Sequence, residues 1–69
     1  MSQVIRAKLA DNVKKFRELK GYTREELSIM LGFDNSYISK LERKSLNITI
    51  DRVAIIAKAL GVEVYQLLE

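Results

Sequence analysis

The chain has 69 residues, carries 12 lysines and arginines against 9 acidic residues, and contains neither cysteine nor histidine. We expect a single domain over residues 1–69 with no disulfide, zinc site, cofactor or small-molecule ligand, and nearly every catalytic arrangement that needs a thiol or an imidazole is excluded. We therefore expect that the protein is not an enzyme. No apolar run is long enough to span a bilayer and the first residues do not resemble a signal peptide, so we also expect a soluble cytoplasmic protein.

The charge is unevenly distributed along the chain. Residues 1–45 hold ten basic and six acidic residues, a net charge of +4, whereas residues 46–69 hold two and three, a net charge of −1. A basic segment of this kind favours a polyanionic partner. The alternative interpretation is an ordinary solvated charged surface.

Residues 2–20 are predicted to form a first helix that ends at Gly21. One face of it carries an apolar stripe at helical spacing, made by Ile5, Leu9, Val13 and Phe16. Thr23 is placed to cap a second helix, and Glu26, three residues later, completes a capping box. Arg24 lies in the first turn of that helix and is expected to point outward, where it meets a phosphate or only solvent.

Residues 24–43 have the pattern of a helix, a sharp turn and a second helix. Two pairs of apolar residues at helical spacing, Leu27 with Leu31 and Ile38 with Leu41, give each helix one apolar face. Between them Gly32 is expected to take the left-handed conformation that turns the chain. Ser28 is expected inside the corner, where a larger side chain would hold the helices apart.

The second of these helices is expected to expose a short polar row. Phe33 is predicted to fill the turn, and Asp34 to cap the helix by accepting from amides of its first turn. The side chains then left exposed are Asn35, Ser36, Tyr37, Ser39 and Lys40.

Residues 49–68 are predicted to form two closing helices. Thr49 caps the first, which runs to Leu60 and ends at Gly61, and residues 62–68 form the second, with Leu67 in the core. The inward face of the longer helix is expected to hold Val53, Ile56, Ala57 and Leu60. The remaining apolar residues exceed what a small core can use, and they are Ile48, Ile55, Val64, Tyr65 and Leu68.

The segment REELSIMLGFDNSYISKLER resembles the helix-turn-helix of the lambda-repressor-like (Xre, Cro/repressor) family. The residues that match the family pattern are Leu27, Ser28, Leu31, Gly32, Phe33, Ile38 and Leu41. The resemblance continues over roughly residues 5 to 68, and it implies an all-α fold of five helices. Departures are Ile29 and Met30, where the family has polar residues, and Lys44 and Ile48, where it often has Gly and Pro. The loop thereby resembles that of the controller proteins of restriction–modification systems.

The resemblance implies binding of double-stranded DNA, with the second helix of the motif, near residues 35–42, in the major groove. Base contacts are then expected from Asn35, Ser36, Ser39 and Lys40. Phosphate contacts are expected from Thr23, Arg24, Tyr37, Arg43 and Lys44. For each of these residues the alternative is an ordinary solvated helix surface. The family also commonly pairs residues at the positions of Arg17 and Glu42, which implies a structural ion pair.

A homodimer that regulates transcription from an operator of two half-sites follows from the same resemblance. Its interface is expected to be the surplus apolar surface of Ile48, Ile55, Val64, Tyr65 and Leu68. A different class of function stays open, namely an antitoxin-like or other protein-interaction module.

Overall fold

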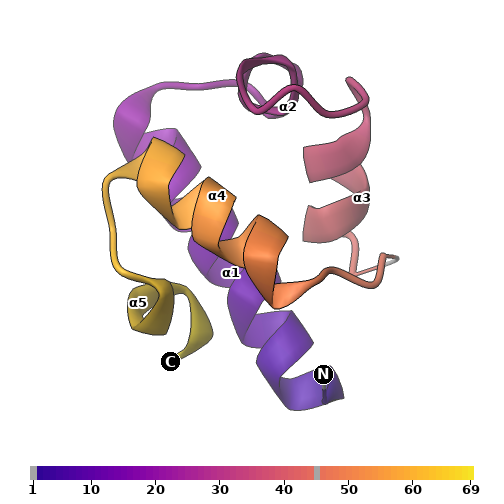
Figure 1. Cartoon of the computed structure of the whole chain (residues 1–69), viewed down its shortest axis with the longest axis vertical. Coiled ribbons are helices and arrows are strands. Elements are labelled where there is room, and N and C mark those ends of the chain that lie inside the picture. The colour runs from indigo at the N-terminus through magenta and orange to yellow at the C-terminus, as the bar shows by residue number, and fades with distance from the viewer. Residues whose placement is uncertain (1, 45) are drawn as a thin grey trace.

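The computed structural model describes residues 2–44 and 46–69, and in these ranges the chain forms five helices and no strand (Figure 1). The helices are α1 (Gln3–Lys20), α2 (Arg24–Met30), α3 (Tyr37–Glu42), α4 (Ile50–Leu60) and α5 (Val64–Leu68). The expected all-α fold with five helices is confirmed. Within the described ranges no helix is both long enough and apolar enough to cross a membrane.

The long helix α1 supports most of the domain. It packs against α3, α4 and α5, while α2 packs against α3 to form the helix-turn-helix (Figure 1). The Ser2 hydroxyl accepts from the amide of Ile5 at 3.2 Å at the start of α1. The predicted apolar stripe is confirmed at Leu9 and Val13, but Ile5 retains 38% of its surface because it lies near the helix end, beyond the reach of the core.

The predicted helix caps are present. The amide of Glu26 donates to the Thr23 hydroxyl at 3.0 Å, and the amide of Thr23 donates to the Glu26 carboxylate at 2.8 Å, which is a complete capping box. The Thr49 hydroxyl accepts from the amide of Arg52 at 3.2 Å at the start of α4. Gly32 has a φ of 76°, the left-handed conformation expected of the residue that turns the chain after α2.

The core lies between the five helices, and each of them contributes at least one buried residue to it. Every inward residue predicted for α4 is buried, Leu67 is fully buried, and Leu31 is partly buried. The fully buried large apolar side chains are Leu9, Val13, Leu27, Ile38, Leu41, Val53, Ile56, Leu60 and Leu67.

The C-terminal helix is fixed to α1 by a contact that the sequence pattern does not reveal. The side-chain amide of Asn12 donates to the backbone carbonyls of Leu67 at 3.0 Å and Glu69 at 3.1 Å. These bonds satisfy carbonyls at the end of α5 that have no partner within the helix. The helix begins at Val64, two residues later than expected, because Glu63 takes the capping position and its amide donates to Gln66 at 2.8 Å.

The surplus apolar residues differ in exposure. Ile55 and Tyr65 keep 45% and 62% of their surface, whereas Ile48, Val64 and Leu68 are partly buried and pack against the core. The structure adds Ile50, which is 58% exposed and was not in the predicted set. The accessible apolar surface at this side of the chain is therefore smaller than predicted.

Lys44 has the left-handed backbone conformation without being glycine. Its φ is 62°, and its amide donates to the carbonyl of Leu41 at 3.0 Å at the end of α3. A side chain in this conformation costs about 1–2 kcal/mol, because its Cβ crowds the backbone.

We expect Lys44→Gly to raise the free energy of unfolding by roughly 0.5–1 kcal/mol, because relief of the strain exceeds the entropy that glycine adds to the unfolded chain. Urea denaturation measures the change. Asn47→Gly is the matched control in the same loop, since Asn47 has no positive φ to relieve. Equal or lower stability of Lys44→Gly relative to the unchanged chain would contradict the strain.

Candidate nucleic-acid interface

The side chains predicted to read bases lie at the start of α3 and along its outer side. We call Asn35, Ser36, Ser39 and Lys40 the recognition row. Asn35 and Lys40 are exposed, while Ser36 and Ser39 are partly accessible. The row spans the turn before α3 and the first part of the helix, because α3 begins at Tyr37.

Asp34 stabilises the turn before α3 and not the helix itself. Its carboxylate accepts from the amide of Ser36 at 3.0 Å and from the Ser36 hydroxyl. The prediction that Asp34 caps amides in the first turn of the helix is therefore wrong. The helix begins after Ser36, and the side chain of Ser36 makes no capping bond. The consequence for recognition is chemical. Because the Ser36 hydroxyl donates to Asp34, it is left to accept a hydrogen bond, as from an amino group of adenine or cytosine.

The same hydrogen bonds hold Asp34 in its charged form. Bonds from the Ser36 hydroxyl and amide lower the pKa of Asp34 below its ordinary value, and the nearby charge of Lys40 acts in the same direction. A carboxylate with a lowered pKa in the folded state stabilises that state above its unfolded pKa, and the contribution is lost as the pH falls through the folded pKa. The two hydrogen bonds from Ser36 to the charged Asp34 carboxylate are therefore retained at neutral pH.

Tyr37 is not part of the exposed row. Only 6% of its surface is accessible, its hydroxyl is buried, and its ring packs against Phe33 with the centroids 4.6 Å apart. The expectation of an exposed Tyr37 is wrong because the first residue of α3 turns toward the core and meets the aromatic residue that fills the turn. This geometry removes the basis for a phosphate contact from Tyr37.

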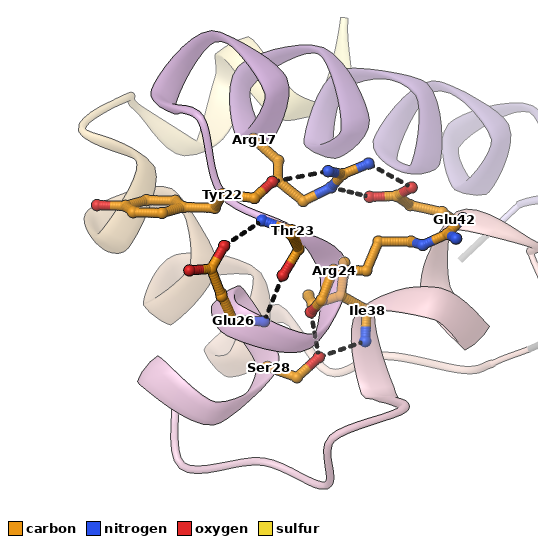
Figure 2. A network of polar contacts seen from close by, with 8 residues as sticks. All are labelled: Arg17, Tyr22, Thr23, Arg24, Glu26, Ser28, Ile38 and Glu42. Carbon is orange, nitrogen blue, oxygen red and sulfur yellow. Dashed lines mark hydrogen bonds and ion pairs between the residues drawn. The ribbon is translucent and has the colours of Figure 1, made fainter.

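Ser28 joins the two helices of the motif. Its hydroxyl donates to the carbonyl of Arg24 at 2.9 Å and accepts from the amide of Ile38 at 3.0 Å (Figure 2). The sequence pattern indicates only that a small residue is required at this corner. The structure shows a fully buried hydroxyl that satisfies an amide in the first turn of α3. An alanine at this position would fit the space and leave that amide without a partner.

The predicted ion pair between Arg17 and Glu42 is confirmed, and it holds the far end of α3. Arg17 Nε and Nη2 donate to the two carboxylate oxygens of Glu42 at 2.8 and 3.2 Å, and Nη1 donates to the carbonyl of Tyr22 at 2.8 Å (Figure 2). The side chains are only 9% and 6% accessible. The hydrogen bond to Glu42 raises the pKa of Arg17. Two parallel bonds between planar groups fix orientation as well as distance.

The residues predicted to bind phosphates lie on two segments that flank α3 in the sequence. Arg24 is exposed in the first turn of α2, and Arg43 and Lys44 are exposed after α3. The Thr23 hydroxyl accepts the capping bond and keeps its proton for donation. All four side chains are exposed.

Lys14 is a cation near this surface that the motif does not single out. A surface depression of about 620 Å³ between the end of α1 and the start of α2 is lined in part by Lys14, Arg17, Arg24 and Glu18. Arg17 is paired with Glu42. The balance is therefore set by Lys14 and Arg24 against Glu18, which leaves a positive charge that favours an anion. In the sequence, Lys14 is marked only by its position on the charged face of the first helix. Because that face carries charges of both signs, it does not single out Lys14 as part of a binding surface.

Comparison with known proteins places these features in a family. Residues 13–67 match the family model described as Helix-turn-helix (HTH_3). A Neisseria hypothetical transcription factor from Neisseria meningitidis serogroup B is 47% identical over 66 residues, 96% of this chain but only 62% of that protein, so the chain spans less than two thirds of its length. Control protein C.SmaI from Serratia marcescens is 38% identical over 60 residues, which cover 87% of this chain and 71% of that protein.

Solved structures agree with the sequence relatives. The crystal structure of the hypothetical transcription factor NHTF from Neisseria superposes with a TM-score of 0.91 at 46% identity, covering 94% of this chain and 75% of that one. The restriction-modification controller protein C.AhdI from Aeromonas hydrophila gives a TM-score of 0.82 at 29% identity, covering 90% of this chain and 94% of that one.

Proposed function

We propose, from the premise that this chain belongs to the HTH_3 helix-turn-helix family, that it is a transcriptional regulator which binds double-stranded DNA in a sequence-specific manner. The observation that carries the proposal is the recognition row, whose polar side chains are presented by a helix that is anchored through Ser28 and Glu42. A helix of this kind fits the major groove, where short polar side chains reach base edges.

The proposed contacts fall into two groups with different consequences. Asn35, Ser36, Ser39 and Lys40 read bases, and Asn35 is suited to a bidentate contact with adenine because its amide both donates and accepts. Phosphates are held by Thr23, Arg24, Arg43 and Lys44, which set the register of the protein on the duplex without reading sequence.

Selection of binding sites from random DNA tests the proposal, and the selected operator then serves for variants. We expect Asn35→Ala, Ser36→Ala and Lys40→Ala each to weaken operator binding by about 1–3 kcal/mol and to change binding to random DNA less. Titrations with both DNAs by fluorescence anisotropy measure the two affinities. If no DNA sequence is preferred at physiological salt, the proposed function is wrong.

The phosphate residues should behave differently in the same assay. Arg24→Ala and Arg43→Ala are expected to weaken operator and random DNA alike, and to reduce the slope of log affinity against log salt by about one per contact. For Lys44 the glycine variant is preferable, because alanine would keep the strain at a φ of 62°. Lys58→Ala is the matched control, an exposed cation on α4 outside the proposed interface. A salt slope unchanged in all three variants would remove them from the interface.

We further propose that the regulator acts in the cytoplasm as a homodimer on two half-sites. A two-fold dimer presents two recognition helices about one DNA turn apart, on the order of 34 Å, and so doubles the contacts. Ile55 and Tyr65 are the exposed members of the proposed dimer surface, whereas Ile48, Val64 and Leu68 are partly buried and pack against the core. Similarity to C.SmaI and C.AhdI supports a role as controller of a restriction–modification system, which the genes that flank this one would test.

One observation favours the second candidate, a protein-interaction module. Ile29 and Met30 are 60% and 54% exposed on α2, where the family pattern has polar residues. Single exposed apolar residues are ordinary on protein surfaces, so they do not outweigh the recognition row. The second candidate becomes the better one if DNA binding is unaffected by every substitution in the recognition row and by every substitution of the residues proposed to hold phosphates.

A further inference from the structure

Arg52, on the first turn of α4, contacts the segment that carries the start of the recognition row. The carbon at the centre of its guanidinium group lies 4.6 Å from the ring centroid of Phe33 and 5.2 Å from that of Tyr37. The two rings are themselves 4.6 Å apart at an angle of 49°. One cation is therefore shared by two aromatic rings, at distances where a cation–π attraction operates.

The two rings are the boundaries of the turn before α3. Phe33 fills the turn and its amide donates to the carbonyl of Ser28 at 3.0 Å, while Tyr37 is the first residue of α3. Asn35 and Ser36 lie between them in the chain. A side chain that holds both boundaries limits the positions that Asn35 and Ser36 can take.

The backbone of Arg52 is itself fixed. Its amide donates to the Thr49 hydroxyl at 3.2 Å, and α4 is anchored in the core by fully buried Val53 and Ile56. In Figure 1 the first turn of α4 faces the side of the molecule that carries α3. The guanidinium group is thus delivered from a rigid element to the turn before α3.

We propose that Arg52 is a positioning residue for base recognition, which stacks on Phe33 and Tyr37 and so fixes the N-terminal end of α3. Arg17 holds the opposite end of the same helix through Glu42. Arg52 then acts through the rings and not through DNA. Neither the helix-turn-helix pattern nor the predicted contacts include this residue. The proposal rests on the proposed function for its role in recognition, but the stack itself can be tested without DNA.

The first test measures stability. Arg52→Met and Phe33→Leu are made singly and together, and urea denaturation gives their coupling. Both variants should fold, because Arg52 is exposed and leucine fills the turn with a similar volume. We expect Arg52→Met to lower the urea midpoint in the unchanged chain and to have a smaller effect beside Phe33→Leu. Equal effects in both backgrounds would overturn the stack.

The second test measures recognition, with Lys58→Met as the control for loss of one positive charge from α4. We expect Arg52→Met to lower the ratio of operator affinity to random-DNA affinity by about two- to fivefold, and to leave the salt slope unchanged. A slope reduced by about one with an unchanged ratio would make Arg52 a phosphate contact and overturn the proposal. An unchanged ratio and slope would overturn it as well. Failure of the unchanged chain to prefer any DNA would instead reject the proposed function, while the stability test would still decide the stack.

Discussion

Arg17→Met is expected to lower the free energy of unfolding by about 3–5 kcal/mol, because it leaves the Glu42 carboxylate charged, almost fully buried and without its partner. The substitution also leaves the carbonyl of Tyr22 without its donor. In a domain of this size each kcal/mol corresponds to a shift of roughly 4–8 °C in the unfolding midpoint. The thermal midpoint should therefore fall by more than about 10 °C, which circular dichroism measures.

Lys20→Met is the matched control, since it removes a cation from the same last turn of α1 where the side chain is exposed. It should change the midpoint little. A second comparison separates the stranded charge from the lost pair: Arg17→Met combined with Glu42→Leu should be more stable than Arg17→Met alone, because no charge is left buried. Equal midpoints for Arg17→Met and Lys20→Met would show that the pair does not stabilise the fold.

Ile55→Asp and Tyr65→Asp are expected to give folded monomers whose affinity for the operator is lower by roughly 10²-fold or more, because the two half-sites are no longer bound by one dimer. Both side chains are exposed, so a charge there disturbs an interface without entering the core. Val64 is less suitable, since it packs against the core and a charge would harm the fold itself. Sedimentation at several concentrations and anisotropy titration on the operator measure the two effects.

Ile29→Asp controls for the introduction of a charge at an exposed apolar position. Ile29 lies on α2, which is on the far side of the molecule from α5 in Figure 1, so the assembly should be unchanged. The unchanged chain sedimenting as a monomer at high micromolar concentration would refute the dimer.

The features that could be predicted from the sequence are those that depend on neighbouring residues. The capping box of Thr23 and Glu26 and the left-handed Gly32 follow from chemistry within a few positions. The buried faces follow from helical periodicity. The predicted burial was wrong near a helix end, at Ile5. The polar row on the second helix of the motif was predicted in the same way, but Tyr37 in that row is buried and the helix begins only at Tyr37, after the turn that Asp34 stabilises.

The features that could not be predicted depend on which side chains meet when the helices pack together. Tyr37 has a polar group and stood in a polar row, but it is part of the hydrophobic core of the folded domain, where its ring also contacts Phe33 and Arg52. The second role of Ser28 is similar, because a small residue at a corner does not reveal that its hydroxyl satisfies the amide of Ile38. The ion pair was predicted from the resemblance to the family, which commonly pairs these two positions. Nothing in the spacing of Arg17 and Glu42 along the sequence indicates a contact.

The bonds of Asn12 to the end of α5 have a consequence for the order of folding. They join positions 55 and 57 residues apart, whereas the helix-turn-helix closes over about ten residues through Ser28 and Ile38. The entropy lost on closing a loop grows with its length, so the short loop closes at lower cost and the contact between the two ends of the chain comes late. The surface proposed to bind a second subunit, which includes Tyr65, is then completed last. A chain emerging during synthesis would form its recognition helix before it gained the means to pair.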